Sequence, residues 1–134
     1  MILAMKTKTA AASKSKRVLL VDDHPLMREG IAQWIGRDAG LEVCGQAGST
    51  SQAFSLAEKL KPDIVVTDIS MSGRNGLELI KDMQTAQPGL PILVLSMHDE
   101  SLYAERVLRA GARGYLMKST PTAEIMQGIR RVRD

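Results

Sequence analysis

The sequence predicts an α/β fold: a doubly wound, five-stranded parallel sheet in the order 2-1-3-4-5, flanked by five helices. Three observations support this prediction. The chain has 134 residues, the usual size of one domain. From residue 17 onward, short β-branched runs alternate five times with stretches of helical periodicity. The first, third and fourth runs are apolar almost throughout, as is typical of strands covered by helices on both faces.

The predicted strands are short aliphatic runs that end near Gly, Pro or Asp. They cover residues 17–22, 41–47, 63–68, 91–96 and 114–118. Gly40, Pro62, Pro88, Gly89 and Gly111 lie at the junctions, where glycine and proline commonly interrupt regular structure.

The five helices are predicted from apolar residues spaced three or four positions apart. Their markers are Met27, Ile31, Trp34 and Ile35; Phe54, Ala57 and Leu60; Leu79, Ile80 and Met83; Tyr103, Val107 and Ala110; and Ile125, Ile129 and Val132. Pro121 suits the first turn of the last helix, and Ser119 or Thr120 is its expected N-cap.

The net charge of +3 and the pI near 9.2 suggest nucleic-acid binding only until the charge is divided by segment. Residues 1–17 carry five basic residues and no acidic one, and the other 117 residues hold 13 basic and 15 acidic residues, a net charge of −2. We therefore expect a disordered basic tail over residues 1–16 and a mildly acidic domain over residues 17–134. Only four residues are aromatic, which argues against a surface that stacks single-stranded bases.

Cys44 is the single cysteine, so an internal disulfide is excluded and a buried thiol in a reducing, cytoplasmic compartment is expected. No apolar run approaches the roughly 20 residues of a membrane span, and we expect no membrane association.

Polar residues stand at the ends of four predicted strands. Asp22 and Asp23 end the first strand, Asp68 the third, Ser96 the fourth and Lys118 the fifth. In an open α/β sheet, ligands bind beyond the carboxyl ends of the strands. Three carboxylates placed together repel one another unless a cation lies between them. The oxygen-rich donor set favours Mg²⁺, which proteins hold with carboxylates and phosphate oxygens, so the pattern indicates phosphoryl chemistry.

Each of these residues also has an ordinary structural interpretation. Asp22 or Asp23 alone could cap the helix that begins near Pro25. Asp68 could cap a turn, Ser96 could be a loop hydroxyl, and Lys118 could be a solvated charge. Their joint occurrence at four strand ends favours a site. His24 shows no partner at ligand spacing in the sequence, and we interpret it as a loop residue.

Four segments in register resemble the receiver domain of two-component response regulators. These segments are VLLVDDHPLMREG, DIVVTDISMSGRNGLE, PILVLSMHDE and GARGYLMKS. The resemblance covers roughly residues 17–134 and is greatest to the NarL/FixJ (LuxR-type) subfamily of nitrate/nitrite and nitrogen-fixation regulators. It implies the flavodoxin-like receiver fold.

The resemblance also implies a role for each site residue. Asp68 would be the phosphoacceptor that takes a phosphoryl group from a sensor histidine kinase or a phosphotransfer protein. Asp22, Asp23, Asp68 and the backbone carbonyl of Ser70 would bind Mg²⁺, and Lys118 and Ser96 would contact the phosphoryl group. Ser96 and Tyr115 would act as the switch, with Tyr115 rotating inward as Ser96 moves.

The same resemblance implies a signalling module rather than a metabolic enzyme, with at most self-phosphorylation and slow autodephosphorylation. Its output would be a DNA-binding helix-turn-helix domain, for which 134 residues leave no room. Two interpretations remain open: the regulatory part of a transcription factor, and a stand-alone or degenerate receiver that acts only through protein–protein contacts. The sequence also leaves open whether phosphorylation drives homodimer formation.

A flavin-binding protein of the same fold is a competing hypothesis. It is disfavoured because Asp22 and Asp23 occupy the first strand-to-helix loop, where a bound phosphate needs backbone donors from Gly, Ser or Thr.

Overall fold

The computed structural model describes residues 15–69, 76–97 and 101–134, in which five strands alternate with five helices. The strands are β1 (Lys16–Val21), β2 (Leu41–Ala47), β3 (Ile64–Asp68), β4 (Ile92–Ser96) and β5 (Gly114–Met117). The helices are α2 (Pro25–Gly36), α3 (Thr50–Leu60), α4 (Gly76–Ala86), α5 (Ser101–Ala110) and α6 (Thr122–Arg133). Every predicted strand is present, with ends within one residue of the expected ones.

The strands form one parallel sheet in the order β2-β1-β3-β4-β5, which confirms the predicted topology. The register between β1 and β2 shifts after Val18, which pairs with Val43, while Leu19 pairs with Gly45. Cys44 is therefore the extra residue of a bulge in an edge strand. The other three strand pairs keep an unbroken register, so the central strands end at closely matched heights.

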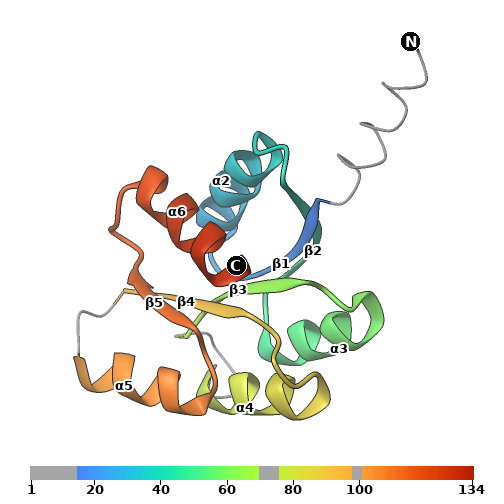
Figure 1. Cartoon of the computed structure of the whole chain (residues 1–134), viewed down its shortest axis with the longest axis vertical. Coiled ribbons are helices and arrows are strands. Elements are labelled where there is room, and N and C mark those ends of the chain that lie inside the picture. The colour runs from blue at the N-terminus through green and yellow to red at the C-terminus, as the bar shows by residue number, and fades with distance from the viewer. Residues whose placement is uncertain (1–14, 70–75, 98–100) are drawn as a thin grey trace.

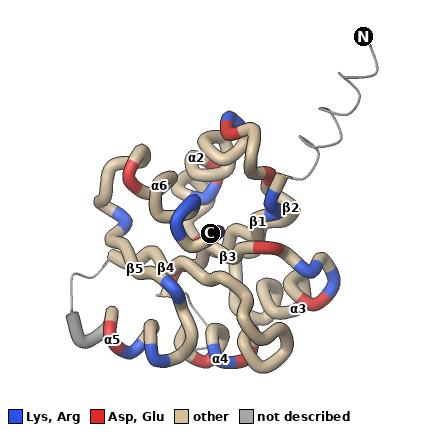
Figure 2. The backbone as a smooth tube through the Cα atoms, viewed as in Figure 1, with Lys and Arg blue, Asp and Glu red and all other residues tan. Residues whose placement is uncertain are grey.

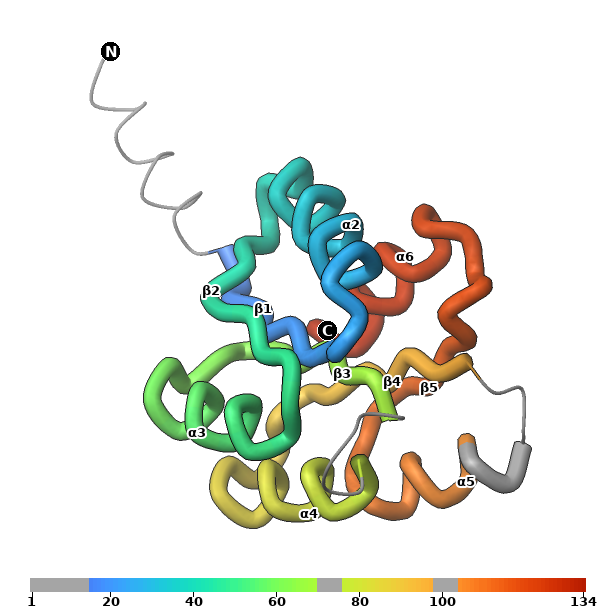
Figure 3. Tube along the Cα trace, turned by 180° about the vertical axis from the view of Figure 1, so that it is seen from behind, coloured from blue at the N-terminus to red at the C-terminus, as the bar shows by residue number. Residues whose placement is uncertain are grey.

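Helices cover both faces of the sheet, α2 and α6 on one side and α3, α4 and α5 on the other (Figures 1 and 3). Each face has its own apolar cluster. Val18 and Leu20 of β1 pack toward α2 and α6, whereas Leu19 and Val21 pack toward α3, α4 and α5. Successive strand residues point to opposite faces, so burial on both sides explains why these runs are apolar throughout.

Charged residues lie mainly around this core, and basic and acidic positions are interspersed along the helices (Figure 2). Glu58 and Lys59 on α3 are both exposed, and Glu105 and Arg109 on α5 form an ion pair of 2.7 Å. Within the described residues, none of the helices combines the length and apolar character needed to cross a membrane.

Two helix starts differ from the sequence expectation. The N-cap of α6 is Pro121 itself, with extended backbone angles (φ −55°, ψ 142°), so the helix begins at Thr122 and neither Ser119 nor Thr120 caps it. The N-cap of α2 is His24, and its side chain makes no capping hydrogen bond. Asp22 instead accepts a 2.8 Å hydrogen bond from the backbone N–H of His24, which shapes the loop before α2.

Two side chains are less buried than expected. Cys44 is only partly buried because it lies in the bulge of edge strand β2, and burial is the main cause that raises the pKa of its thiol above 9.0. Trp34 is 42% exposed, because Ile31 and Ile35 take the positions of α2 that face the sheet. The guanidinium carbon of Arg37 lies 5.4 Å from the centre of the Trp34 ring, a cation–π contact.

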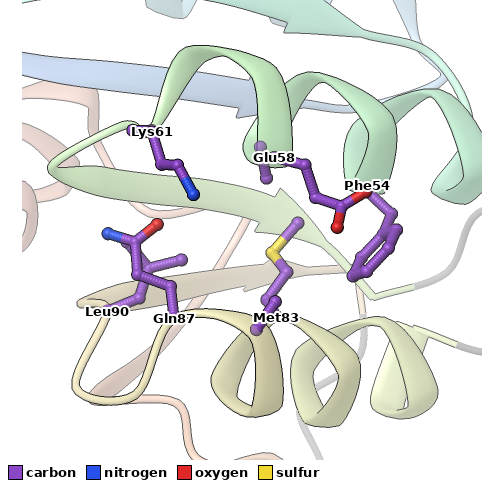
Figure 4. A pocket seen from close by; sticks show the side chains of 8 residues that line it. Phe54, Glu58, Lys61, Met83, Gln87 and Leu90 are labelled. Carbon is purple, nitrogen blue, oxygen red and sulfur yellow. The ribbon is translucent and has the colours of Figure 1, made fainter.

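Helices α3 and α4 pack side by side and leave a small cavity of about 50 Å³ between them (Figure 4). Its lining includes Phe54, Glu58, Lys61, Met83, Gln87 and Leu90. None of these is a predicted site residue, and a cavity of this size admits only a few water molecules.

Gly76, the first residue of α4, is expected to tolerate no side chain. A Cβ atom there would lie 2.6 Å from the carbonyl oxygen of Ile69, which follows the last residue of β3. Gly76→Ala should therefore lower the free energy of unfolding by about 1–3 kcal/mol, because backbone must move to relieve the overlap.

The matched control is Gly30→Ala in the exposed interior of α2, where a Cβ has no neighbour within 4 Å. That change should raise the free energy of unfolding by about 0.5–1 kcal/mol. Urea denaturation of the three proteins checks both signs, and equal effects of the two substitutions would contradict the close contact at Ile69.

Candidate functional site

The register of the sheet brings the predicted site residues to one edge. Val21 pairs with Thr67, so Asp22 lies level with Asp68 at the carboxyl ends of β1 and β3. Ser96 ends β4 and pairs with Met117, and Lys118 follows at once. Asp22, Asp68, Ser96 and Lys118 are all buried, and among the described residues the other buried polar side chains are the threonines Thr50 and Thr67.

Lys118 is the centre of the cluster. Its Nζ lies 2.9 Å from Asp68 Oδ2 and 2.9 Å from Asp22 Oδ2, and its backbone N–H donates to the carbonyl of Ser96 at 2.7 Å. Burial lowers the pKa of Lys118, but hydrogen bonds to Asp68 and Asp22 and the negative charges of these two residues together raise it by more, so the net pKa lies above its ordinary 10.5. Lys118 therefore carries its charge at neutral pH and offsets the repulsion between the two carboxylates.

His24 also belongs to the cluster, which differs from its interpretation as a loop residue without partners. Its Nδ1 lies 2.9 Å from Asp22 Oδ1, 3.1 Å from Asp23 Oδ1 and 3.7 Å from Asp68 Oδ2. The sequence signal was present, because His24 directly follows two aspartates at a strand end. The turn that folds its ring back over the strand ends was not predictable from spacing alone.

Arg28 is a second residue that the sequence interpretation missed. From the first turns of α2, its Nη1 donates to the backbone carbonyl of Asp22 at 2.6 Å and its Nε donates to Gln46 Oε1 at 3.1 Å. The backbone N–H of Asp22 in turn donates to Ala47 at 2.9 Å. Arg28 thus ties the loop after β1 to β2 and holds the Asp22 backbone in place.

The cluster fits a divalent cation. One ligand atom from each of Asp22, Asp23, His24 and Asp68 lies within 4.8 Å of the others. Three carboxylates and the Lys118 ammonium leave a formal charge of −2 in a largely buried site, and such charges are stable only when balanced. Carboxylate oxygens are the donors that Mg²⁺ prefers, so these three side chains suit the predicted ion.

The two predicted switch residues lie on neighbouring strands. Ser96 is fully buried at the end of β4. Tyr115 on β5 pairs with Val94 and is half-buried against the apolar cluster on the α3, α4 and α5 side. Ser70, predicted to supply a backbone carbonyl to the cation, lies outside the described residues.

A comparison with known families agrees with this arrangement. Residues 18–130 match the family described as the response regulator receiver domain. The chain belongs to this family. Receiver domains of this kind are signalling domains that interact with sensor kinases or phosphotransfer proteins.

Curated relatives place this receiver domain in the NarL/FixJ type. It is 39% identical over 116 residues to the response regulator GacA of Pseudomonas aeruginosa, covering 87% of this chain and 54% of the relative. It is 35% identical over 114 residues to the nitrate/nitrite response regulator protein NarP of Escherichia coli, covering 85% of this chain and 53% of the relative. The chain thus spans about half the length of these relatives.

Solved structures show the same receiver fold. A LuxR-family response regulator from Aurantimonas sp. SI85-9A1 superposes with a TM-score of 0.85 at 36% identity, covering 89% of this chain and 85% of the other. The signal receiver domain of the putative response regulator NarL from Mycobacterium tuberculosis superposes with a TM-score of 0.84 at 28% identity, covering 90% and 97%.

Removing the ammonium group of Lys118 should destabilise the domain. In EDTA at pH 7, Lys118→Met should lower the free energy of unfolding by about 3–5 kcal/mol, because it leaves Asp22 and Asp68 without their shared partner. The pKa of Lys118 is raised on folding, so its contribution is complete below pH 10.5 and is lost as pH rises through the raised value.

The difference between wild type and Lys118→Met should accordingly shrink above pH 10.5 in urea denaturation. Exposed Lys59→Met is the control and should change stability by about 0.5 kcal/mol or less. A difference that stays constant at high pH would show that the ammonium charge is not what stabilises the site.

Proposed function

We propose that this receiver domain, spanning residues 17–134, is cytoplasmic and accepts a phosphoryl group on Asp68 from a sensor histidine kinase or a phosphotransfer protein, in a reaction that depends on Mg²⁺. The observation that carries the proposal is the placement of Asp68: a buried carboxylate at a strand end, 2.9 Å from a buried ammonium and beside two further aspartates. Family membership supports the same assignment.

In the proposed reaction, one carboxylate oxygen of Asp68 attacks the phosphorus of a phosphohistidine on the partner. The new oxygen–phosphorus bond forms as the phosphorus–nitrogen bond breaks. The electron pair of that bond returns to the imidazole, which takes up a proton, and Asp68 becomes an acyl phosphate. Aspartyl phosphate formation is an established type of covalent catalysis.

Asp22, Asp23 and Asp68 would hold the Mg²⁺, together with the backbone carbonyl of Ser70. When bound, the ion supplies positive charge that offsets the charge on the transferring phosphoryl oxygens. The hydrogen bond from Arg28 to the backbone carbonyl of Asp22 supports this role, because it fixes the backbone that carries the carboxylate. Asp23 is the most exposed of the three carboxylates, with 26% of its side chain accessible, so the site opens to solvent on its side.

Lys118 and Ser96 would contact the phosphoryl group after transfer. Lys118 contacts Asp68 Oδ2 and donates its backbone N–H to Ser96, so the two side chains come from strand ends that are already joined. Because a phosphorylated aspartate adds negative charge, Lys118 would pair with the new group. The Ser96 hydroxyl would donate to one of its oxygens.

The switch would follow from the movement of Ser96. A hydroxyl drawn toward the phosphoryl group would vacate space near the end of β4. Tyr115, half-buried on neighbouring β5, would rotate into that space and change the surface of β5 and the helices beside it. Phosphorylation of Asp68 would in this way cause a side-chain movement on another strand.

The wider protein would use this switch to control a DNA-binding output domain, and this chain would itself contact no DNA. A further domain is supported by the relatives, because the chain spans only about half of the length of each.

The alternative is a receiver that acts only through protein–protein contacts, without phosphorylation. Catalysis would be limited to self-phosphorylation and slow autodephosphorylation.

The phosphoacceptor assignment predicts a single labelled residue. Incubation with Mg²⁺ and acetyl phosphate should add one phosphoryl group to the wild-type protein, and hydroxylamine should remove it, because acyl phosphates react with this nucleophile. Asp68→Asn should stay unlabelled, because the neutral amide of asparagine lacks the carboxylate oxygen that attacks the phosphorus. Intact-mass spectrometry measures both results.

Asp134→Asn, at an exposed site near the end of the chain, is the matched control and should be labelled as wild type is. Undiminished labelling of Asp68→Asn would overturn the assignment. An unlabelled wild-type protein would favour the alternative of a receiver that acts by contacts alone.

The cation site predicts a specific stabilisation. Mg²⁺ at 100 times its Kd should raise the free energy of unfolding by about 2.7 kcal/mol, because it binds only the folded protein. Asp23→Asn should reduce this gain at the same Mg²⁺ concentration while leaving the contacts of Lys118 with Asp22 and Asp68 intact.

Thermal unfolding of each protein in MgCl₂, compared with NaCl at the same ionic strength, measures the stabilisation by Mg²⁺. An equal gain in wild type and in Asp23→Asn would place the bound Mg²⁺ elsewhere on the protein.

A further inference from the structure

The geometry assigns His24 as a fourth side-chain ligand of the cation in this site, one that biases the site from Mg²⁺ toward divalent transition metals such as Ni²⁺. This inference rests on the proposed cation site of Asp22, Asp23 and Asp68 and adds a nitrogen donor to it.

The distances at His24 match those between neighbouring ligands of one ion. Metal–ligand bonds of about 2.1 Å at right angles place adjacent ligand atoms about 3 Å apart. His24 Nδ1 lies 2.9 Å from Asp22 Oδ1 and 3.1 Å from Asp23 Oδ1. Asp68 Oδ2 is more distant, at 3.7 Å, but still within the 4.8 Å that spans all four ligand atoms. One ion can therefore contact the imidazole and the carboxylates together.

The hydrogen-bonding groups around His24 Nδ1 also favour a bound cation. Lys118 Nζ lies 3.1 Å from this nitrogen and can only donate, whereas the surrounding carboxylate oxygens accept. A single ring nitrogen carries either a hydrogen or a lone pair, so it cannot satisfy both kinds of neighbour. A cation among these groups would receive the nitrogen lone pair and the carboxylate oxygens at once.

The backbone holds the ring in this position. His24 is the N-cap of α2 and has an extended conformation (φ −100°, ψ 101°), which the following Pro25 favours. Its backbone N–H is bound to Asp22 at 2.8 Å. The side chain is 56% exposed, so the ring lies on the solvent side of the cluster rather than in the core.

The nitrogen donor changes the expected metal preference. Oxygen donors suit Mg²⁺ and Mn²⁺, whereas imidazole suits Ni²⁺, Cu²⁺ and Zn²⁺. Replacing the ring should therefore weaken transition-metal binding much more than Mg²⁺ binding. A ring that merely fills space beside the site would show no such difference between metals.

The test is isothermal titration of the full chain with NiCl₂ and, separately, with MgCl₂. His24→Asn keeps a polar residue suited to an N-cap but removes the imidazole, and His24→Ala removes all donors. Both should lower Ni²⁺ affinity about tenfold or more. Mg²⁺ affinity should change by less than about threefold, which also shows that the variants are folded, since Mg²⁺ draws on the three carboxylates.

The control is His98→Ala, which removes the other histidine of the chain and should leave the ratio of Ni²⁺ to Mg²⁺ affinity unchanged. Loss of Ni²⁺ affinity in His98→Ala but not in the His24 variants would overturn the assignment. An equal fall for both metals in the His24 variants would overturn it too.

A spectroscopic measurement detects the bond between the metal and the His24 nitrogen directly. Electron spin echo envelope modulation of the Mn²⁺-loaded protein should show nitrogen coupling from an imidazole, and this coupling should be absent from His24→Asn. If wild type is phosphorylated with Mg²⁺ but shows no nitrogen coupling, the role of His24 is wrong and the proposed function stands. If wild type binds neither metal and takes up no phosphate, the proposed function itself fails.

Discussion

The contact of Lys118 with both Asp22 and Asp68 is the interaction on which the site depends. Three carboxylates at one edge of a sheet would repel one another strongly in a buried setting. The ammonium lies 2.9 Å from two of them and offsets part of this repulsion. The same interaction leaves an excess of negative charge. The charge that remains is of the sign that attracts a cation.

The sheet register supplies the precision that this contact needs. Asp22 lies level with Asp68 because β1 and β3 pair without a bulge, while the irregularity at Cys44 is confined to the outer side of β1. Two helices, α2 and α4, contact the backbone just beyond the ends of β1 and β3. Arg28 fixes the Asp22 carbonyl from α2, and Gly76 lets α4 begin directly against the backbone of Ile69, one residue beyond Asp68.

Most of the fold and the core of the site were predictable from the sequence, for physical reasons that particular residues show. Strands buried on both faces leave continuous apolar runs, and parallel strands bring Asp22, Asp68 and Lys118 to one edge by topology alone. His24 was not predictable as part of the site, because its contacts depend on the path of a loop. Trp34 has helical spacing but lies at the border of the buried stripe, a difference that periodicity does not resolve.

The separation of the core into two clusters has a consequence for how such domains diversify. Neighbouring residues of one strand belong to different clusters, Val18 and Leu20 to one and Leu19 and Val21 to the other. Substitutions that lie more than about 7–10 Å apart and share no partners have nearly additive effects on stability, so the outer parts of the two helical layers can change almost independently. The edge that carries Asp68 lies between them. The cluster around Asp68 can therefore be kept while either outer surface is rebuilt for a new partner.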